Sequence, residues 1–548
     1  MRTPSDFFPL RLLASAVAFA TLSACTTVNV DMPELQTSLP MQMDAASPRA
    51  PGSPMADLAN WWQTLDDPVL TGYIDEGLKR NTDVRVALAR VKEARAYLGV
   101  AESTYYPTVE ATAGAGRTRQ NTPVPIQNQL NLPVNLPIPL PQVDTQPTMS
   151  LGNTHGFGLN AVWEVDVFGS RHSDAEMVHQ LMLGAQEQQH GAQLLVASDI
   201  ASHYFEARGA ERRLILLQQG VLVARRLHQY AQGRFKAGQT TASEVDRAGL
   251  QVDYTESQIE PLKALLQSHI RRIAVLMGRA PETLTSLPPQ PASFHLPTAL
   301  PEVMPSDVLE RRPDVRGAAR KVRSQVAKLG SAKAELFPKF YIGFGGMAGR
   351  MHPDAMEGNN FSVQSLGIGM RLPLLEGGRI RANIAANQAQ LEGVAAQYEQ
   401  AVLTALEDVE NAFTAKKAFD ARYDKLSSSA RLARRVAEHK QALFVSGTEL
   451  LQPALEAEAT ALQREDEAIQ VDVSRALYTV LLYKALGGGW SAQRDARSTR
   501  YCCTRRWAVG GPLNATTGPC PWSRRPPWRL ARHHCRRAWK VFDAQGVG

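Results

Sequence analysis

The sequence predicts an α+β membrane protein in which long helical hairpins are duplicated in tandem and four β-strands are added per chain. Three observations predict this fold. Segments of the first half recur in the second, the helical segments are too long for a compact domain, and short segments alternate in hydrophobicity. The chain has 548 residues, of which 44% are hydrophobic and 21% charged, so its composition is that of a folded protein.

The N-terminus has the order of a bacterial export signal. Arg2 and Arg11 precede an apolar run from Leu12 to Leu22 that is too short to cross a bilayer, so residues 1–24 are predicted to be a signal peptide. Leu22-Ser23-Ala24-Cys25 resembles the lipobox of bacterial lipoproteins, and Cys25 is the only cysteine before the C-terminal tail. We expect acyl chains on Cys25; a plain secretory signal followed by a chance cysteine is the alternative.

Internal repetition sets the domain organisation. Asp83-Val84-Arg85 recurs as Asp314-Val315-Arg316, and the match runs without gaps over 25 positions at a spacing of 231 residues. Beyond the predicted strands the spacing falls to 208 or 209, which pairs Gly169 with Gly377. The first half therefore carries about 23 extra residues between its two strands, in the Pro-rich segment 121–147.

The repeats divide the chain into domains that follow the signal peptide. These are a lipidated extended segment, a first repeat, a Pro-rich linker, a second repeat and a basic tail, at residues 25–70, 71–280, 281–308, 309–490 and 491–548. Each repeat reads in the order helix, two strands, long helix, turn, helix.

Helix lengths independently indicate an elongated fold. Residues 170–236 form a 67-residue segment, about 100 Å long as an α-helix, and segments 71–104 and 243–277 together reach about the same length when stacked. One long helix beside two stacked shorter ones gives a wall of uniform height. Pro261 is expected to bend the second short helix. His269 follows the apolar seam of that helix and is interpreted as a packing residue, with no metal ligand expected.

The strand segments alternate between apolar residues and small or polar ones. The apolar positions are Phe157, Leu159, Ala161, Trp163 and Val165 in the first half, and Phe340, Ile342, Phe344, Leu366, Ile368, Met370 and Leu372 in the second. Such segments suit a transmembrane barrel, and four strands are too few to close one. The chain is therefore expected to share a barrel with further copies.

Three sequence blocks carry a family resemblance. Trp163-Glu164-Val165-Asp166-Val167-Phe168-Gly169, then Arg311-Arg312-Pro313-Asp314-Val315, then Gly377-Gly378-Arg379 resemble the outer-membrane factors of the TolC superfamily. The lipobox places the chain in the lipoprotein branch, with the OprM- or NodT-like proteins. The resemblance covers residues 25–490. It implies a TolC-like homotrimer with a twelve-stranded β-barrel and an α-helical tunnel, in the bacterial outer membrane and extending into the periplasm.

The same resemblance implies a function and partners. The chain would be the exit duct of a tripartite efflux system, a passive conduit that works with a periplasmic adaptor (a membrane fusion protein) and an inner-membrane transporter of the resistance-nodulation-division class. A structural or adaptor lipoprotein without a pore is the alternative, and paired lipid-facing strands argue against it. No paired nucleophile and base is present, so no enzyme and no cofactor are expected. The cargo is not encoded in any motif.

The periplasmic mouth is expected at the two helical turns farthest from the strands. Thr241-Ala242-Ser243-Glu244 is a capping-box sequence that would restart a helix after the first turn. Five charged residues are gate candidates: Glu244, Asp246, Arg247, Glu449 and Glu456. Arg247 corresponds to Glu456 at the repeat spacing, so equivalent positions would carry opposite charges around a threefold ring. The alternative is that these groups are solvated and favour helix N-termini.

The charge of the chain is concentrated in its tail. Residues 491–548 carry eleven Arg and one Lys against two Asp, so the rest of the chain is mildly acidic although the whole has a net charge of +7. An acidic body does not favour nucleic acid. The tail lacks apolar periodicity, and its cysteines and histidines have no paired ligand spacing. It is predicted to be frame-shifted or disordered; a basic arm that binds anionic lipid or cell wall is the alternative.

Overall fold

The computed structural model describes residues 58–121, 149–289, 304–353 and 359–490, with short pieces at 30–33, 40, 43–44, 294–297 and 302. All of these belong to one compact unit, residues 1–492. The signal peptide, Cys25 and the basic tail lie outside the described residues.

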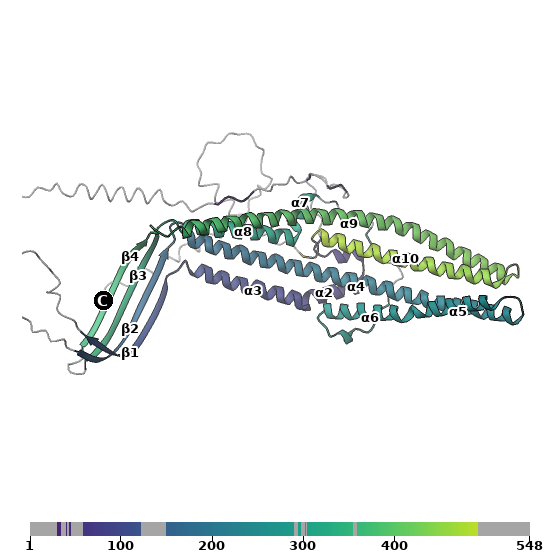
Figure 1. Cartoon of the computed structure of the whole chain (residues 1–548), viewed down its shortest axis with the longest axis horizontal. Coiled ribbons are helices and arrows are strands. Elements are labelled where there is room, and N and C mark those ends of the chain that lie inside the picture. Colours follow the sequence, from purple (N-terminus) through teal and green to yellow (C-terminus); the bar gives the residue numbers. More distant parts are fainter. Residues whose placement is uncertain are drawn as a thin grey trace, which may run out of the picture. The chain divides into compact units, whose positions relative to one another are not determined.

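The two repeats follow the same order of elements, but the second ends in one helix where the first ends in two (Figure 1). The first consists of α2 (Pro68–Arg80), α3 (Thr82–Ser103), β1 (Thr108–Asn121), β2 (Met149–Val165), α4 (Ser170–Lys236), α5 (Ala242–Ser257) and α6 (Ile259–Leu276). The second consists of α7 (Pro305–Arg311), α8 (Pro313–Ala334), β3 (Lys339–Pro353), β4 (Asn359–Arg371), α9 (Arg379–Val445) and α10 (Leu451–Ala485). Two short 3₁₀ helices, η1 (Trp61–Leu65) and η3 (Pro281–Thr283), precede α2 and follow α6. Helical structure thus begins within the segment expected to be extended, and α7 begins within the expected linker.

The long helices confirm the length prediction. Helix α4 has 67 residues as expected, and α9 has the same length. Each follows a glycine with positive φ, Gly169 at 77° and Gly378 at 84°, a conformation that glycine adopts without steric cost. These glycines are 209 residues apart, so the pairing of Gly169 with Gly377 was wrong by one position: Gly377, with φ of 59°, is an additional turn residue.

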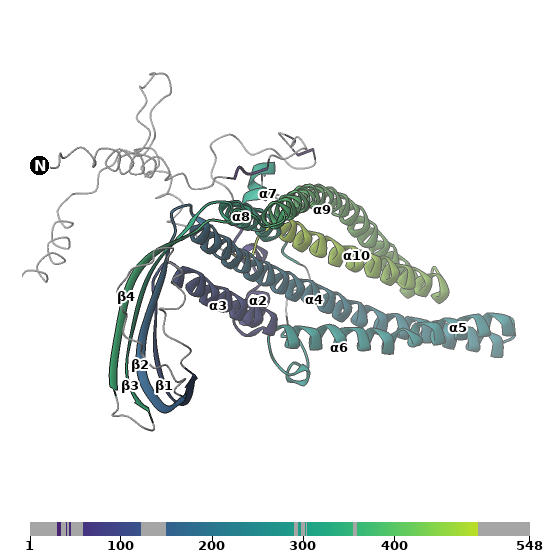
Figure 2. The ribbon, with the colours of Figure 1, turned by 60° about the vertical axis from the view of Figure 1, so that its left-hand side comes forward.

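Shorter helices lie in series along each long one. Helices α3, α2, α6 and α5 contact α4, while α8 and α10 contact α9 (Figures 1 and 2). Helix α4 also contacts α8 and α10, so it joins the two repeats. Within the described residues, no helix combines the length and the apolar content needed to cross a membrane.

The expected helix 71–104 is instead two helices, because Asn81 ends one and caps the next. Asn81 has φ −55° and ψ 137°, and its Oδ1 accepts hydrogen bonds from the amides of Asp83 and Val84 at 2.8 and 3.3 Å. Its Nδ2 donates to the carbonyl of Leu276 at the end of α6, at 2.9 Å. A local cap and a long-range bond therefore outweigh helix propensity at this residue.

The break in the second short segment lies where a proline predicts it. Helices α5 and α6 separate at Gln258, three residues before Pro261. Proline has no amide hydrogen and its ring crowds the preceding turn, so the predicted bend is confirmed as a break.

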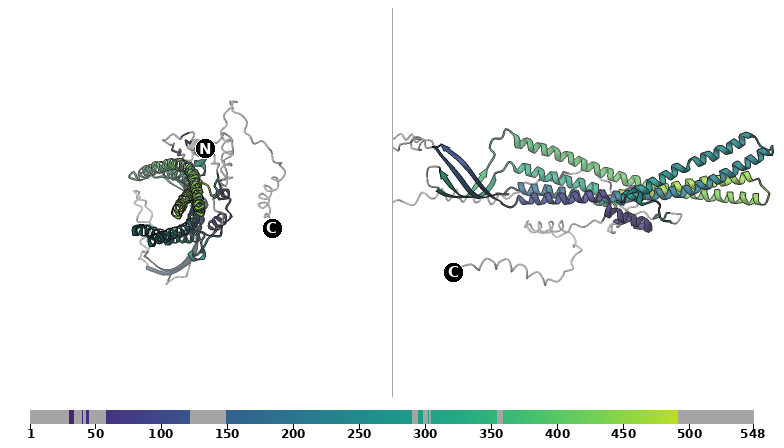
Figure 3. Two further views of the ribbon diagram at one scale, coloured as in Figure 1. Left: turned by 90° about the vertical axis from the view of Figure 1, so that its right-hand side faces the viewer. Right: turned by 90° about the horizontal axis from the view of Figure 1, so that it is seen from below.

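The strands form one antiparallel sheet of order β1-β2-β3-β4, which confirms the two predicted hairpins. The strands connect the ends of helices, and the sheet that they form lies past those ends (Figure 3, right). The register places Leu159 opposite both Ala111 and Gly346, and Ile342 opposite both Trp163 and Ile368. The predicted apolar positions thus share one face, except Leu372, which lies after the end of β4.

The main core lies where the two repeats meet. Trp61 is fully buried and stacks on Tyr483 of α10, with ring centroids 5.1 Å apart. Tyr204 of α4 is also fully buried, and its hydroxyl donates to Asp67 at 2.7 Å. Burial and this bond to a carboxylate raise the pKa of Tyr204 well above its ordinary value, so the phenol remains a donor. The N-terminal helices are therefore fixed to both repeats.

Candidate functional site

The first hairpin turn joins α4 to α5 mainly through backbone hydrogen bonds. Gly238 has φ of 69°, and its amide donates to the carbonyl of Phe235 at 2.9 Å. Thr241 is the residue before α5, but its side chain makes no capping hydrogen bond, so the predicted capping box is wrong. The amide of Glu244 donates instead to the backbone carbonyl of Thr241 at 3.1 Å, and the Glu244 carboxylate faces Arg247.

The second turn has more side-chain bonds than the first. The hydroxyls of Ser446 and Thr448 both donate to the carbonyl of Leu443, at 2.9 and 3.0 Å, and close the end of α9. Glu449 forms an ion pair with Lys440, which ties the turn back to α9. The second tip is therefore bound to its own helix through a charged side chain.

The remaining gate candidates lie on the tips as expected, but none bonds to the other hairpin within one chain. Arg247 is exposed and lies 3.4 Å from Glu244 of its own helix. Glu456 is exposed and accepts from Gln452, one turn earlier, at 2.9 Å. Asp246 is also exposed. The proposed Arg247–Glu456 pair therefore requires neighbouring copies of the chain.

Arg234 connects the two tips and was missed from the sequence. One of its guanidinium nitrogens donates to Oε1 of Gln452 in α10 at 3.3 Å, and another donates to the carbonyl of Gln239 in the first turn at 3.1 Å. Nothing in the sequence near Arg234 marks it as a link between the hairpins, because Gln452 lies on a helix more than 200 positions away. The hairpins of one chain are thus linked at their ends.

Below the tips, α4 and α10 are joined by apolar and ionic contacts. Val223 packs with Leu455 and Leu462 in a small buried cluster. Arg213 pairs with Asp466 at 2.7 Å, and Arg212 pairs with the fully buried Asp472 at 2.8 Å. Buried charges need such partners, so these contacts fix the register of the two helices.

The second arginine of the Arg-Arg-Pro-Asp-Val block, Arg312, connects three helices. Arg312 is the residue before α8, the position that Asn81 occupies before α3 in the first repeat, but its side chain makes no capping hydrogen bond; it is 8% exposed. Its guanidinium pairs with Asp314 at 2.6 Å and Asp408 at 2.9 Å, and donates to the carbonyl of Ala485 at 3.3 Å. Burial alone would raise the pKa of Asp314, but the bonds and charge of Arg312 lower it below its usual value. The block therefore joins α8, α9 and α10.

The apolar face of the sheet is largely open. Ile368 is 82% exposed and Leu366 77%, although both lie on the same face as Phe157 and Leu159. The opposite face is mixed: Gly367 and Ser365 lie on it, together with the apolar pair Met347 and Val363. An exposed apolar surface of this extent is a contact surface for lipid or another molecule.

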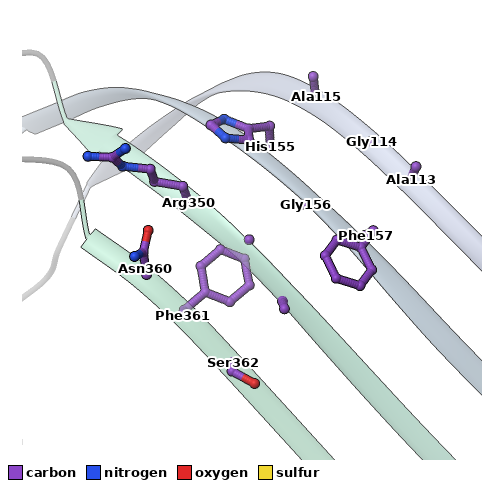
Figure 4. Close-up of a pocket in the computed structure, with 12 residues that line it drawn as sticks. Ala113, Gly114, Ala115, His155, Gly156, Phe157, Arg350, Asn360, Phe361 and Ser362 are labelled. Carbon is purple, nitrogen blue, oxygen red and sulfur yellow. The ribbon is translucent and has the colours of Figure 1, made fainter.

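A shallow hollow of about 970 Å³ lies near the distal ends of the strands (Figure 4). It forms where Gly156 and Gly349, cross-strand partners, leave space between larger side chains. His155 and Arg350 line one end, with Phe361 nearby. All of the residues that line the hollow belong to the four strands of the sheet.

Comparison with known proteins agrees with this architecture. The family model described as "Outer membrane efflux protein" matches residues 73–279 and 304–488. Among curated proteins, the pyoverdine export outer membrane protein OpmQ of Pseudomonas aeruginosa is 24% identical over 443 residues, covering 81% of this chain and 90% of its own. Nodulation protein T of Rhizobium leguminosarum bv. trifolii is 27% identical over 442 residues, covering 79% and 88%.

The solved structure of the outer-membrane channel OprN superposes with a TM-score of 0.71 at 26% identity, covering 85% of this chain and 99% of its own. Fold, sheet and both repeats are therefore those of the TolC superfamily. The chain belongs to the outer membrane efflux protein family, as an outer-membrane factor.

Proposed function

We propose that this chain forms, as a homotrimer, the outer-membrane exit duct of a tripartite efflux system. It is a passive conduit from the periplasm to the outside, and it is not an enzyme. The observation that carries the proposal is the sheet: four strands with two open edges and one apolar, exposed face. Three such sheets supply twelve strands, enough to close a barrel whose apolar face meets lipid.

The helices support the same function. Two 67-residue helices of about 100 Å, each lined by shorter helices in series, give one chain a wall tall enough to reach far into the periplasm. The relatives named above are export proteins and a channel of the outer membrane. A periplasmic adaptor and a resistance-nodulation-division transporter are the partners we propose at the periplasmic end. The conduit itself has no energy source.

A matched pair of substitutions tests the lipid-facing surface. Ile368→Arg places a charge on the exposed apolar face and should cost about 2–4 kcal/mol of insertion free energy. Gly367→Arg is the control, because a side chain there points to the other face and has nothing within 4 Å of its Cβ. Purified protein is reconstituted in planar bilayers, and conductance and membrane-inserted yield are measured.

The proposal expects wild type and Gly367→Arg to insert as trimers that conduct, and Ile368→Arg to insert poorly. Trimers of wild type that insert but never conduct, even with a matched adaptor, would favour a structural lipoprotein without a pore. Equal insertion of both variants would remove the lipid-facing role of this surface.

We also propose that Cys25 anchors the mature chain in the outer membrane. The lipobox and the isolation of Cys25 from the other cysteines support this proposal. Cells fed radioactive palmitate should label wild type but not Cys25→Ser. Persistent labelling of the serine variant would place the acyl chain elsewhere.

A further inference from the structure

Two imidazoles and a carboxylate meet between α4 and α6, away from the hairpin tips. His203 and Glu206 are one turn apart on α4, and His269 faces them from α6. The Nδ1 atoms of the histidines lie 3.0 Å apart, and each is 3.2 Å from Oε2 of Glu206. Within the described residues, this is the one group of three or more such side chains close enough to hold a metal ion.

Protons alone do not satisfy this triangle. An ionised glutamate only accepts hydrogen bonds. Both histidines must therefore donate from Nδ1 if each is to form a hydrogen bond with Glu206. The two N–H groups then face each other across 3.0 Å, which is a repulsive donor–donor contact. If one histidine is instead deprotonated at Nδ1, its lone pair faces the carboxylate. A cation bonded to all three atoms removes the conflict.

The dimensions suit a transition metal. A triangle with sides of 3.0 to 3.2 Å has its centre about 1.8 Å from each corner, so an ion about 1 Å out of the plane lies about 2.1 Å from all three atoms. That is the usual length of zinc–imidazole and zinc–carboxylate bonds. Two imidazoles with one carboxylate also suit nickel and copper, whereas calcium and magnesium prefer oxygen ligands.

The site is accessible to water. The side chain of His269 is 14% exposed, while His203 and Glu206 are about one-third exposed, so water reaches one side of the triangle.

We propose that His203, Glu206 and His269 form a binding site for a divalent transition cation such as Zn²⁺, which clips α4 to α6 and keeps open positions toward solvent. The interpretation of His269 as a packing residue thus accounts for only part of its environment. Sequence spacing alone does not show this site, because His269 lies on another helix, 63 positions or more along the chain from Glu206 and His203.

Zinc binding to tag-free trimer in detergent tests the proposal, measured by equilibrium dialysis in competition with a fluorescent chelator. Wild type should bind one Zn²⁺ per chain at this site, and His203→Ala or His269→Ala should weaken that binding at least tenfold. His179→Ala is the matched control. His179 also lies on α4, and its Nδ1 is 3.5 Å from the carboxylate of Glu176, one turn away. Within the described residues, His179 belongs to no group of three possible metal ligands. This variant should bind as wild type does.

Glu206→Gln, nearly isosteric, covers the case in which an alanine variant does not assemble. It should keep the trimer and lose zinc affinity. X-ray absorption at the zinc edge should show imidazole and carboxylate ligation in wild type. The site is refuted if wild type fails to bind zinc, or if His179→Ala reduces binding as much as His203→Ala does.

Discussion

Arg434 of α9 donates to Glu465 of α10 at 2.7 Å, and this pair repeats, 209 positions later, the pair that Arg225 of α4 makes with Glu256 of α5 at 2.8 Å. The duplication therefore preserves an ionic contact as well as helix lengths. The second copy is stronger, because Arg434 also pairs with Glu458 at 2.6 Å and is 30% exposed, against 57% for Arg225. Hydrogen bonds to the two carboxylates, chiefly that of Glu465, raise the pKa of the Arg434 guanidinium above its ordinary value.

This difference predicts unequal costs for two equivalent substitutions. Arg434→Ala should destabilise the α9–α10 hairpin by about 1–2 kcal/mol, and Arg225→Ala should destabilise α4–α5 by less than about 1 kcal/mol. Amide hydrogen exchange in the two hairpins measures both effects. Equal loss of protection in the two variants would contradict the prediction.

The gate prediction concerns charges that meet only between copies. Arg247→Glu or Glu456→Arg alone should raise the conductance of the closed pore in planar bilayers, because each places like charges at equivalent positions of the ring. The double exchange should restore the low conductance. If neither single change alters conductance, or the double exchange fails to restore it, the latch lies elsewhere.

Trp490, the last residue that the structure describes, packs against α4 and α8. Its ring stacks on His190 with centroids 4.2 Å apart, and the guanidinium of Arg316 lies 4.8 Å from its centre. A chain that stops after Trp490 should therefore form cross-linkable trimers as the full chain does. A chain that stops after Gly487 loses this contact and should be destabilised by about 3 kcal/mol. Failure of the longer truncation would show that the tail is required for folding.

The ion pairs of Glu187, which lies beside Trp490, predict that the folded protein loses stability in acid. Its carboxylate pairs with Arg316 at 2.6 Å and His190 at 3.1 Å. Burial raises the pKa of Glu187, but these two partners outweigh burial and lower it below its ordinary value. A lowered folded-state pKa gives stability that is complete above the ordinary glutamate pKa and disappears as pH falls through the folded one.

Glu187→Gln should therefore reduce the melting temperature at pH 7, by the equivalent of about 2 kcal/mol, and flatten its decline between pH 5 and 3. Glu93→Gln, at an exposed position on α3, is the control and should change neither. A wild-type profile as flat as that of Glu187→Gln would exclude this carboxylate as the source of acid sensitivity.

Length and periodicity were sufficient for most of the fold. The 67-residue helix, the strand alternation and the Pro261 break are local patterns that the sequence carries directly. Asn81 ends a helix through a bond to Leu276, and Glu244 bonds to Arg247 in place of a capping box; both outcomes depend on side-chain partners that compete with the local pattern. Arg234 and His203 were missed because Gln452 and His269, which they contact, lie on other helices.

The equal length of α4 and α9 also restricts how this chain can change in evolution. One residue inserted into either helix would turn everything after it by about 100° and lengthen the wall by about 1.5 Å, displacing the ion pairs with α10 and the tips together. Insertions are tolerable only in segments that do not set the register between two helices. The two halves differ in this way: 27 residues separate β1 from β2, but 5 separate β3 from β4, so the halves differ in a connection between strands while their long helices have equal lengths.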